Sequence, residues 1–558
     1  MPIGPQSELL EFTIQGPFGG IQSEAPPERI ENSGFADVNN ILFHRGEARV
    51  RPRSNDLPVQ PASPDPGLRI IDLVGEIQDQ TWTPSSLRLS TGLVEAWVGV
   101  ADFFNVDGNR LQVAMTPTRM LQWVGGGWSV LPGGFSGLVT DKFSSAVVAE
   151  KLCTCQGVDK VMLWDGQSTS FGEIADSVPS KFLMELANHL IACRTIEGGG
   201  KAYQRVRWTG ADDPTDWTSL NSGQIDLFND LGPINGCVKL FRFGYIFQQK
   251  GIVQVIPTGI GTNAFVFQAL SSSAKGLTCP YSLAVNGETD CAYVGKDNVY
   301  AFDGTSSTPI GDMPMANGGR VGARKRIFAD LMHSEPDNVV GFVTTSINGN
   351  PFNAYWLVIP EVATWVFNYD EMNWTRLTWA NKISVIGNFQ RQGPIRIADL
   401  IGAIGQQAWS PATLLNNNPF DSLFLGYANG NPGIFDFTGW SEEPWYIETG
   451  QMAFGNFRYE KVIKKLRLVY RDYGEATINV QIVNDRGQVW APSSITANPD
   501  EVTETLVGNG GGRTLSTLMQ PSISGMFNTI RISGAPDQPF AFTELTSIYS
   551  VGGEQRFS

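Results

Sequence analysis

One short pattern recurs along most of this chain: two or three apolar or aromatic residues, a tight turn, and another apolar pair. Its first five copies lie 41 to 47 residues apart, and the last two gaps grow to about 65 to 70 residues. The copies are "MLQWVGGGWSV" near Trp123, "KVMLWDGQSTSF" near Trp164, "RVRWTGADDPTDW" near Trp208, "GIVQVIPTGIGTNAF" near Val255, "NVYAFDGTSSTPIG" near Phe302, "TWVFNYDEMNWTRL" near Phe367 and "PGIFDFTGW" near Phe435. We interpret each copy as a β-hairpin, in which a dipeptide such as Asp165-Gly166 or Asp303-Gly304 closes a two-residue turn.

A repeat of about 40 to 50 residues is typical of one four-stranded blade of a β-propeller. The chain has 15 Trp and 32 Phe but only 17% charged residues, which also favours an all-β fold. We therefore expect a β-propeller-like main domain of about six or seven blades over residues 61–440. The longer late gaps would hold insertions, one of them helical over residues 323–335, where apolar residues are spaced i,i+4. The alternative is a series of unrelated hairpins in stacked sandwiches.

The pattern changes after Trp440. Apolar residues now alternate with polar ones, which predicts strands with one buried face. We expect residues 441–558 to form a separate C-terminal antiparallel β-sandwich. The residues expected on the buried faces are Leu466, Leu468, Tyr470, Ile478, Val480, Ile482, Ile530 and Ile532.

The first 60 residues contain much turn chemistry and few core residues, so they cannot fold alone. We expect this N-terminal segment to pack on the propeller or on a neighbouring subunit, or to close a blade with a later strand and so remove a sheet edge. Arg49, Arg51 and Arg53 occupy alternate positions, which predicts one shared strand face. They would meet carboxylates of a neighbouring blade or subunit; the alternative is that they face phosphate groups.

No catalytic constellation emerges from the sequence. His44, His189 and His333 are far apart, and neither a G-x-S-x-G nucleophile turn nor a phosphate-binding G-x-x-x-x-G-K-[ST] loop is present. His189 is expected to be a packed or hydrogen-bonded histidine. Cys153 and Cys155 would share a strand face, which is conceivable for a two-thiolate metal clamp, but we favour small buried apolar residues.

Three aspartates, Asp212, Asp213 and Asp216, resemble loosely the aspartate turns of sialidase propellers. Those enzymes also need an arginine cluster and a tyrosine nucleophile, which we do not locate here. We therefore expect an Asx-rich turn. The sequence predicts no enzyme activity, no cofactor and no metal site.

The net charge of −15 argues against broad adhesion to nucleic acid, which requires clustered Lys and Arg. No run reaches the roughly 18 apolar residues that a membrane-spanning helix needs. The first residues show neither the basic nor the apolar region of a secretory signal. We therefore expect a protein without a membrane-spanning segment, made in a cytoplasm, with its six cysteines reduced.

Three stretches of the sequence resemble a known family of proteins. Its opening, "GPFGGIQSEAPPERIENSGFADVNNILFHRGEARVRPR", looks like the start of many bacteriophage virion proteins. Two later stretches, residues 188–256 and 275–312, look like the tail hub and nozzle (tail tubular) proteins of short-tailed phages, with a Trp-Ser/Thr…Asp-Trp turn and a Gly…Pro-Ile-Gly turn. The resemblance covers roughly residues 14–320.

The resemblance implies a structural virion protein that forms a ring of identical subunits, most often six. Such a hub or nozzle would lie below the portal and adaptor proteins in the virion tail, after assembly in the host cytoplasm. It would close the channel before ejection and carry genomic DNA during it, without sequence-specific binding. Arg467 and Arg471, with the neighbouring lysines Lys464 and Lys465, would contact another tail or adaptor protein, or form a solvated strand face.

Two other classes of function stay open. One is a receptor- or glycan-binding propeller tail protein, possibly glycan-cleaving, which predicts an acidic pocket with clustered aromatic residues. The other is a cellular interaction scaffold, which predicts a stable monomer.

Overall fold

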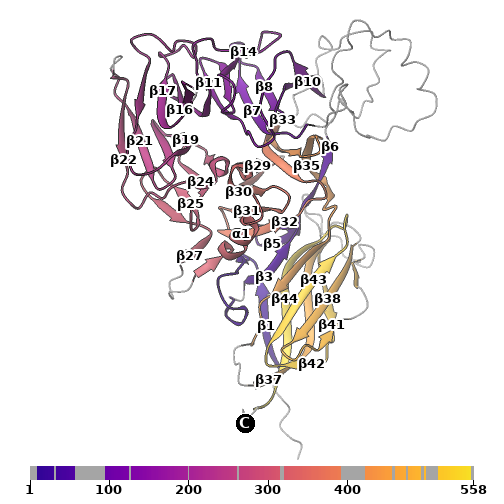
Figure 1. Cartoon of the computed structure of the whole chain (residues 1–558). Coiled ribbons are helices and arrows are strands. Elements are labelled where there is room, and N and C mark those ends of the chain that lie inside the picture. The colour runs from indigo at the N-terminus through magenta and orange to yellow at the C-terminus, as the bar shows by residue number, and fades with distance from the viewer. Residues whose placement is uncertain are drawn as a thin grey trace, which may run out of the picture.

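The computed structural model describes residues 9–30, 33–56, 95–124, 127–198, 200–259, 263–314, 320–347, 349–390, 421–430, 432–454, 459–472, 476–491, 495–497 and 513–554. These residues form an all-β protein: a seven-bladed β-propeller and a β-sandwich (Figure 1). The expected fold class is therefore confirmed, and of the two expected blade numbers the structure has seven.

Each blade is a four-stranded antiparallel sheet, and its strands follow one another side by side from the propeller axis outward (Figure 1). The first four blades follow one another along the chain. Their strands, from the innermost outward, are β7 (Gly99–Phe104), β8 (Arg110–Met115), β9 (Met120–Val124) and β10 (Gly127–Leu131) in blade 1; β11 (Ser144–Val148), β12 (Lys151–Cys155), β13 (Met162–Trp164) and β14 (Gly172–Glu173) in blade 2; β15 (Ser180–Leu186), β16 (His189–Glu197), β17 (Gly200–Trp208) and β18 (Gly223–Asp226) in blade 3; and β19 (Ile234–Leu240), β20 (Phe243–Gln248), β21 (Ile252–Pro257) and β22 (Phe265–Ala269) in blade 4.

The last three blades include an insertion and one strand from the N-terminal part of the chain. Their strands are β23 (Ala284–Asn286), β24 (Asp290–Val294), β25 (Val299–Phe302) and β26 (Ser307–Pro309) in blade 5; β29 (Val340–Ile347), β30 (Asn350–Ile359), β31 (Ala363–Asn368) and β32 (Asn373–Leu377) in blade 6; and β33 (Ile383–Gln390), β34 (Asp421–Tyr427), β35 (Pro432–Trp440) and β6 (Pro52–Asp56) in blade 7.

The recurring sequence pattern marks the same place in every blade. Its seven copies supply, in order, the third strands β9, β13, β17, β21, β25, β31 and β35. The expected helix is also present: α1 (Arg324–Leu331) lies between blades 5 and 6, after the hairpin of β27 (Asp312–Pro314) and β28 (Arg320–Gly322). The second long gap contains residues 391–420, which lie outside the described residues.

The ring of blades closes between blades 7 and 1. Inner strand β33 lies beside inner strand β7, and aromatic side chains of both blades form one cluster. Trp123 of blade 1 meets Phe389 of blade 7 edge-on, with ring centroids 4.9 Å apart. The outermost strand of blade 7 is β6, which pairs antiparallel with β35. The N-terminal part of the chain therefore completes the last blade.

The sandwich consists of two sheets, each built from both ends of the chain. The first sheet contains β1 (Leu9–Gln15), β4 (Ile41–His44), β5 (Glu47–Val50), β37 (Tyr459–Asp472), β41 (Arg513–Met519), β42 (Ile523–Gly525) and β44 (Ala541–Glu554). The second contains β2 (Gly20–Ile21), β3 (Gly34–Asn39), β36 (Trp445–Thr449), β38 (Ala476–Asn484), β39 (Val489–Trp490), β40 (Ile495–Ala497) and β43 (Asn528–Gly534). Residues 9–50 thus belong to the sandwich, so the sandwich is not formed by residues 441–558 alone, as we expected, and these N-terminal residues are part of its sheets. The residues expected on its inner faces are all buried.

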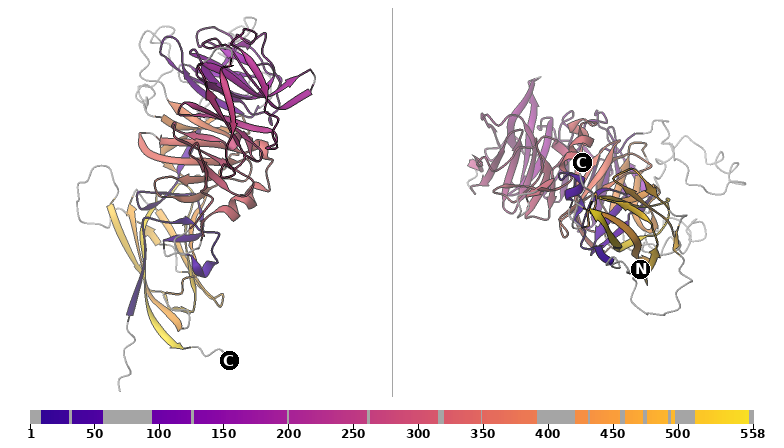
Figure 2. Two further views of the ribbon diagram at one scale, coloured as in Figure 1. Left: turned by 90° about the vertical axis from the view of Figure 1, so that its left-hand side faces the viewer. Right: turned by 90° about the horizontal axis from the view of Figure 1, so that it is seen from below.

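One hydrophobic cluster continues from the sandwich into blades 5 and 6 of the propeller. The left view of Figure 2 shows the sandwich extending directly from one side of the propeller. Strands β2, β3 and β4 cover β32, the outer strand of blade 6. There, Asn373 Nδ2 donates to Phe18 O at 2.7 Å, and Asn368 Nδ2 donates to Phe43 O at 2.9 Å. The outer edge of blade 6 is therefore buried under the sandwich, and the two domains form one block.

The Asp-Gly dipeptides lie in turns between the third and fourth strands, but the turns are longer than the two residues that we expected. Residues 165–171 join β13 to β14, and residues 303–306 join β25 to β26. Each aspartate uses its side chain to accept from backbone N–H groups: Asp165 Oδ1 from Ser168 at 2.7 Å, Asp303 Oδ1 from Thr305 at 2.8 Å. These Asx turns replace the backbone pairing of a two-residue hairpin.

Gly166 and Gly304 have φ angles of +75° and +92°, a region that L side chains rarely adopt. A Cβ at Gly166 would lie 2.5 Å from Leu111 of blade 1, and one at Gly304 would lie 2.9 Å from Tyr245 of blade 4. We predict that replacing either glycine with Val lowers the free energy of unfolding by about 1–3 kcal/mol through backbone strain, with steric overlap adding to it. Chemical denaturation would measure this.

Gly172 provides the matched control, because it lies on exposed strand β14, its φ is not positive, and no atom lies within 4 Å of an added Cβ. Gly172→Val should leave the stability nearly unchanged. Equal stability of all three variants would contradict the role assigned to Gly166 and Gly304.

Candidate functional site

The aspartates 212, 213 and 216 form a surface turn between β17 and β18. Asp213 Oδ1 accepts from the backbone N–H and the hydroxyl of Thr215, at 2.9 and 2.6 Å. Asp216 Oδ1 accepts from Ser219 N at 3.0 Å, and hydrogen bonding from Ser219 lowers the pKa of Asp216. Both carboxylates are therefore used within the turn, as expected of an Asx-rich turn.

The histidine and cysteine positions also have structural roles. His189 is buried, its Nδ1 lies 2.5 Å from Thr209 O, and its ring packs on Phe265. Cys153 and Cys155 are both buried, and burial raises the pKa of Cys153 to about 12, so its thiol stays protonated. Within the described part of the chain, no group of three or more His, Cys, Asp or Glu residues is placed to hold a metal ion.

The three N-terminal arginines lie where the chain passes from the sandwich to the propeller. They do not share one strand face, because β5 ends at Val50 and β6 begins at Pro52 in a different sheet. Arg49 is half-buried, with its guanidinium 4.9 Å from the Trp440 ring centroid. Arg51 is fully buried between the two strands.

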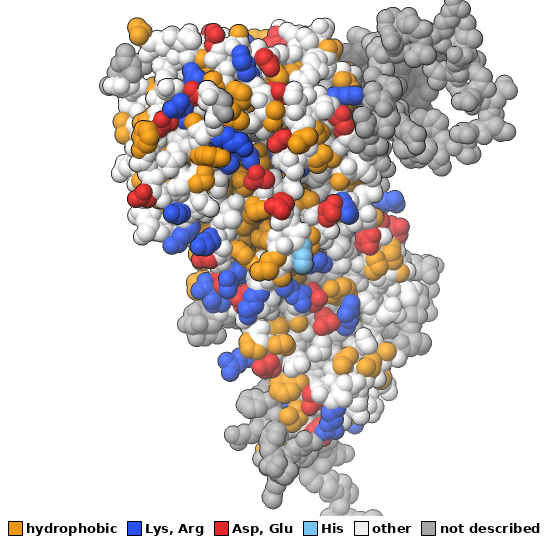
Figure 3. Space-filling view, in the orientation of Figure 1, with side chains coloured by type: hydrophobic (Ala, Val, Ile, Leu, Met, Phe, Trp, Pro, Cys, Tyr) orange, Lys and Arg blue, Asp and Glu red, His pale blue; other side chains and the backbone are white. Residues whose placement is uncertain are grey.

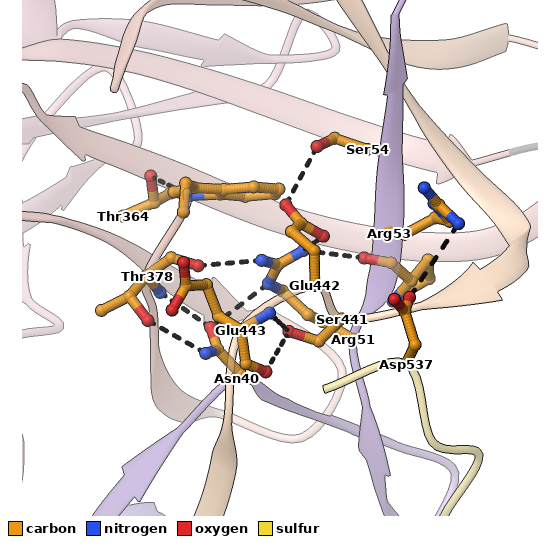
Figure 4. A network of polar contacts seen from close by, with 12 residues as sticks. Asn40, Arg51, Arg53, Ser54, Thr364, Thr378, Ser441, Glu442, Glu443 and Asp537 are labelled. Atoms are coloured by element: carbon orange, nitrogen blue, oxygen red, sulfur yellow. Dashed lines mark hydrogen bonds and ion pairs between the residues drawn. The ribbon is translucent and has the colours of Figure 1, made fainter. Parts of the chain in front are cut away.

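Arg51 is the centre of the polar network shown in Figure 4. Its guanidinium donates to Asn40 Oδ1 at 3.2 Å, to Pro52 O at 2.9 Å and to Thr378 O at 2.9 Å. It also pairs with Glu442 Oε2 at 3.2 Å. Burial lowers the pKa of Arg51, and Glu442 opposes this effect.

The same guanidinium lies over the ring of Trp379, 4.0 Å from its centroid. Asn40, which is also buried and has a φ of +58°, donates to Thr378 Oγ1 and to Pro444 O, both at 2.9 Å. The chain passes between the sandwich and the propeller twice, near Arg51 and near Glu442. The network therefore joins both of these crossings to the segment that links blades 6 and 7. Arg51 is thus a part of the interior and is not exposed to another subunit.

Arg53, Arg467 and Arg471 are at least partly accessible. Arg53 lies 3.9 Å from Asp537 of the sandwich, with 45% of its side chain exposed. Arg471 on β37 pairs with Glu47 of β5 at 2.5 Å. Arg467 is exposed on the outer face of the same strand, close to exposed Lys464 and Lys465.

Basic side chains also gather at the waist of the molecule, around α1 (Figure 3). Carboxylates are interleaved with them: Arg324 pairs with Asp312 at 3.1 Å, and Arg326 pairs with Asp37. This patch is therefore largely neutralised within the chain.

Among the described residues, no helix is long and apolar enough to cross a membrane.

No protein-family model matches this chain. No curated protein matches it in sequence. Some solved structures match this chain at low identity, with TM-scores below 0.5. BamB from Moraxella catarrhalis is 10% identical over 62% of this chain and 84% of that chain, with a TM-score of 0.31. YCF48 from Cyanidioschyzon merolae is 11% identical over 61% and 95%, with a TM-score of 0.35. The extracellular domain of the putative one component system BT4673 from B. thetaiotaomicron is 10% identical over 84% and 59%, with a TM-score of 0.38. These similarities concern the fold alone.

Arg51 and Arg53 provide a direct test of the junction. Removing one partner of a buried, hydrogen-bonded ion pair costs about 3–5 kcal/mol. Loss of Arg51 leaves Pro52 O and Thr378 O without this donor and Glu442, whose side chain is 22% exposed, without its counter-ion, which places the expected loss at the lower end of that range. Arg51→Ala should lower the free energy of unfolding by that amount, measured by denaturant titration followed through tryptophan fluorescence. Arg53→Ala removes an exposed pair and should cost about 0–1 kcal/mol. Similar losses for the two variants would contradict the assignment of Arg51 as the centre of the junction.

Proposed function

We propose that this protein is a structural component of the tail of a short-tailed bacteriophage, in which copies of the chain form a ring that serves as a hub or nozzle. The ring closes the channel before ejection and carries DNA during it. The resemblance of residues 14–320 to such proteins supports the assignment.

The hydrophobic cluster shared by sandwich and propeller is the structural observation that most supports this proposal. A wall element must hold its shape while a charged polymer passes, and a hydrophobic cluster that continues from the sandwich into blades 5 and 6 holds the two domains together as such a block. The Arg51 network adds polar contacts at both crossings between the domains. A mobile two-domain arrangement would suit a soluble scaffold better.

In this proposal the DNA channel lies between copies of the chain. The cavity on the propeller axis has a volume of only about 260 Å³ and is lined by residues of the inner strands. It is far too small to hold a DNA duplex. Propeller and sandwich therefore form the wall of the ring, and the channel is the space that the copies enclose.

The net charge of −15 suits a conduit, because an acidic wall repels the phosphate backbone and prevents DNA from binding during exit. The repulsion acts within a Debye length, roughly 8 Å at physiological salt. The exposed basic residues on β37, Lys464, Lys465 and Arg467, are then candidates for contact with another tail or adaptor protein.

We predict that copies of the protein assemble into a ring, with six as the expected number, and that the net charge of the channel wall is negative. Native mass spectrometry gives the copy number, and a reconstruction of the intact particle gives the position of the chain and the charge of the channel wall. A monomer that lies away from the tail axis, or a lumen lined mainly by Lys and Arg, would contradict the proposal.

We predict that the purified protein hydrolyses no polysaccharide, because Asp213 and Asp216 use their oxygens within a turn. A panel of bacterial surface glycans, assayed for reducing ends, tests this. Asp213→Asn and Asp216→Asn retain the acceptor oxygen and should behave like the wild type. Turnover by the wild type that either substitution abolishes would favour the glycan-cleaving alternative.

A further inference from the structure

A small cavity lies on the propeller axis, at the ends of the inner strands where they begin. Its walls come from several blades, including β7, β11, β15, β19, β29 and β33. Most wall residues are apolar, and examples are Val100, Phe182, Val238, Phe342 and Ile386. With a volume of about 260 Å³, the cavity lies just below the usual range for small-molecule sites, roughly 300 to 1,000 Å³.

One cationic side chain, Lys142, is part of this wall. It lies just before β11, and only 3% of the residue is exposed. Its Nζ donates one hydrogen bond across to Ser384 O, the residue before Val385 in β33, at 3.1 Å. An ammonium group has three donors, and no ion pair of Lys142 occurs among the described residues.

The cavity wall also contains a carboxylate, but this carboxylate already has an ion-pair partner. Asp102 is the one acidic residue among the described residues that line the cavity, and it pairs with Arg110 at 2.5 Å. Arg110 also pairs with Asp421 at 2.6 Å. Asp102 is therefore compensated by a guanidinium on its own blade, and the charge of Lys142 has no carboxylate partner in this cavity.

A buried ammonium without a counter-ion is costly, and buried charges in proteins are normally paired. Burial lowers the pKa of Lys142 to about 8, so at neutral pH most molecules still carry the charge. The cavity beside it has room for a compact partner, and Lys142 is the one cationic side chain among the described residues of its wall.

We propose that the axial cavity binds a small oxyanion, with Lys142 as its counter-ion. The shared chemistry is a compact anionic oxygen group, as in inorganic phosphate or in the carboxylate of a small organic acid. Asn388 also lines the cavity and is a further hydrogen-bonding group there, whereas the hydroxyl of Ser144 already accepts from Leu183 N at 2.9 Å. This inference does not depend on the role of the protein in a phage tail.

The test uses the full-length protein and isothermal titration with inorganic phosphate, and in a separate arm with acetate, at ionic strength held constant with chloride. We expect saturable one-to-one binding of one of them. The same anion should raise the thermal midpoint progressively with its concentration, as a ligand of the folded state does. Absence of saturable binding of either anion would overturn the proposal.

Lys142→Met keeps the length of the side chain and removes the charge, and it should weaken binding at least tenfold. Lys160→Met is the matched control, because Lys160 is an exposed lysine whose Nζ donates to a backbone carbonyl, Ala175 O, at 2.6 Å. It should bind like the wild type. Unchanged affinity of Lys142→Met would place the anion elsewhere and overturn the proposal.

A second variant tests the cavity itself without changing the charge. Val238→Phe fills part of the space between the inner strands and should also weaken binding, while Lys142 is retained. If Lys142→Met does not fold, this variant decides: wild-type affinity in folded Val238→Phe would show that the anion does not occupy the cavity.

Discussion

The pairing of β6 with β35 is the contact on which the rest of the architecture depends. A propeller needs a closed ring, and here the last blade obtains its outer strand from residues 52–56. Because β5 and β36, on either side of this pair in the chain, belong to the sandwich, closing the ring also brings the two halves of the sandwich together. The chain thus crosses between the domains twice at one place, and Arg51 occupies that place.

The crossing explains why so polar a residue is buried. Two chain segments leave the sheet of blade 7 there and enter different sheets of the sandwich. Backbone carbonyls near this place, such as Pro52 O and Thr378 O, therefore need donors from outside a strand pair. A guanidinium has five donors in a planar arrangement and satisfies several of these carbonyls together with Glu442. Its flat face also packs on the ring of Trp379. A lysine at this position would pack less well on that ring, because its ammonium group is not planar.

Local pattern predicted much of this fold, because the recurring motif is a property of each blade by itself. Third strands such as β9, β13 and β25 are largely buried, and so Trp123, Trp164, Phe302 and Phe435 stand out as apolar positions at a regular period. Strand β17 departs from this, because most of its residues are exposed or half-buried. The i,i+4 spacing that predicted α1 is local in the same sense. The turn lengths that we expected at Asp165 and Asp303 were wrong. An aspartate side chain that accepts hydrogen bonds from backbone N–H groups gives the same Asp-Gly dipeptide in a longer loop.

The candidate site was less accessible from sequence. Alternation placed Arg49, Arg51 and Arg53 on one face, but the change of sheet at residue 51 depends on partners roughly 400 residues away, such as Glu442, with a separation of 391 residues. The buried ammonium of Lys142 carried only a weak sequence signal, because its surroundings come mostly from blades that the chain reaches later. What could have drawn attention to it is a single lysine between the apolar segments that precede an inner strand.

The arrangement also determines when the molecule can become complete. Strand β1 pairs with β44, and Thr13 meets Thr546 across a separation of 533 residues. At roughly 5–20 residues per second, a ribosome needs on the order of half a minute to two minutes to connect these partners. During that time the strands that precede the propeller have no sheet to join, while blades 1 to 6 can form behind them in order. A chain released early, before residue 541, would expose those unpaired edges, so quality control by the cell would readily distinguish an unfinished copy from a finished one.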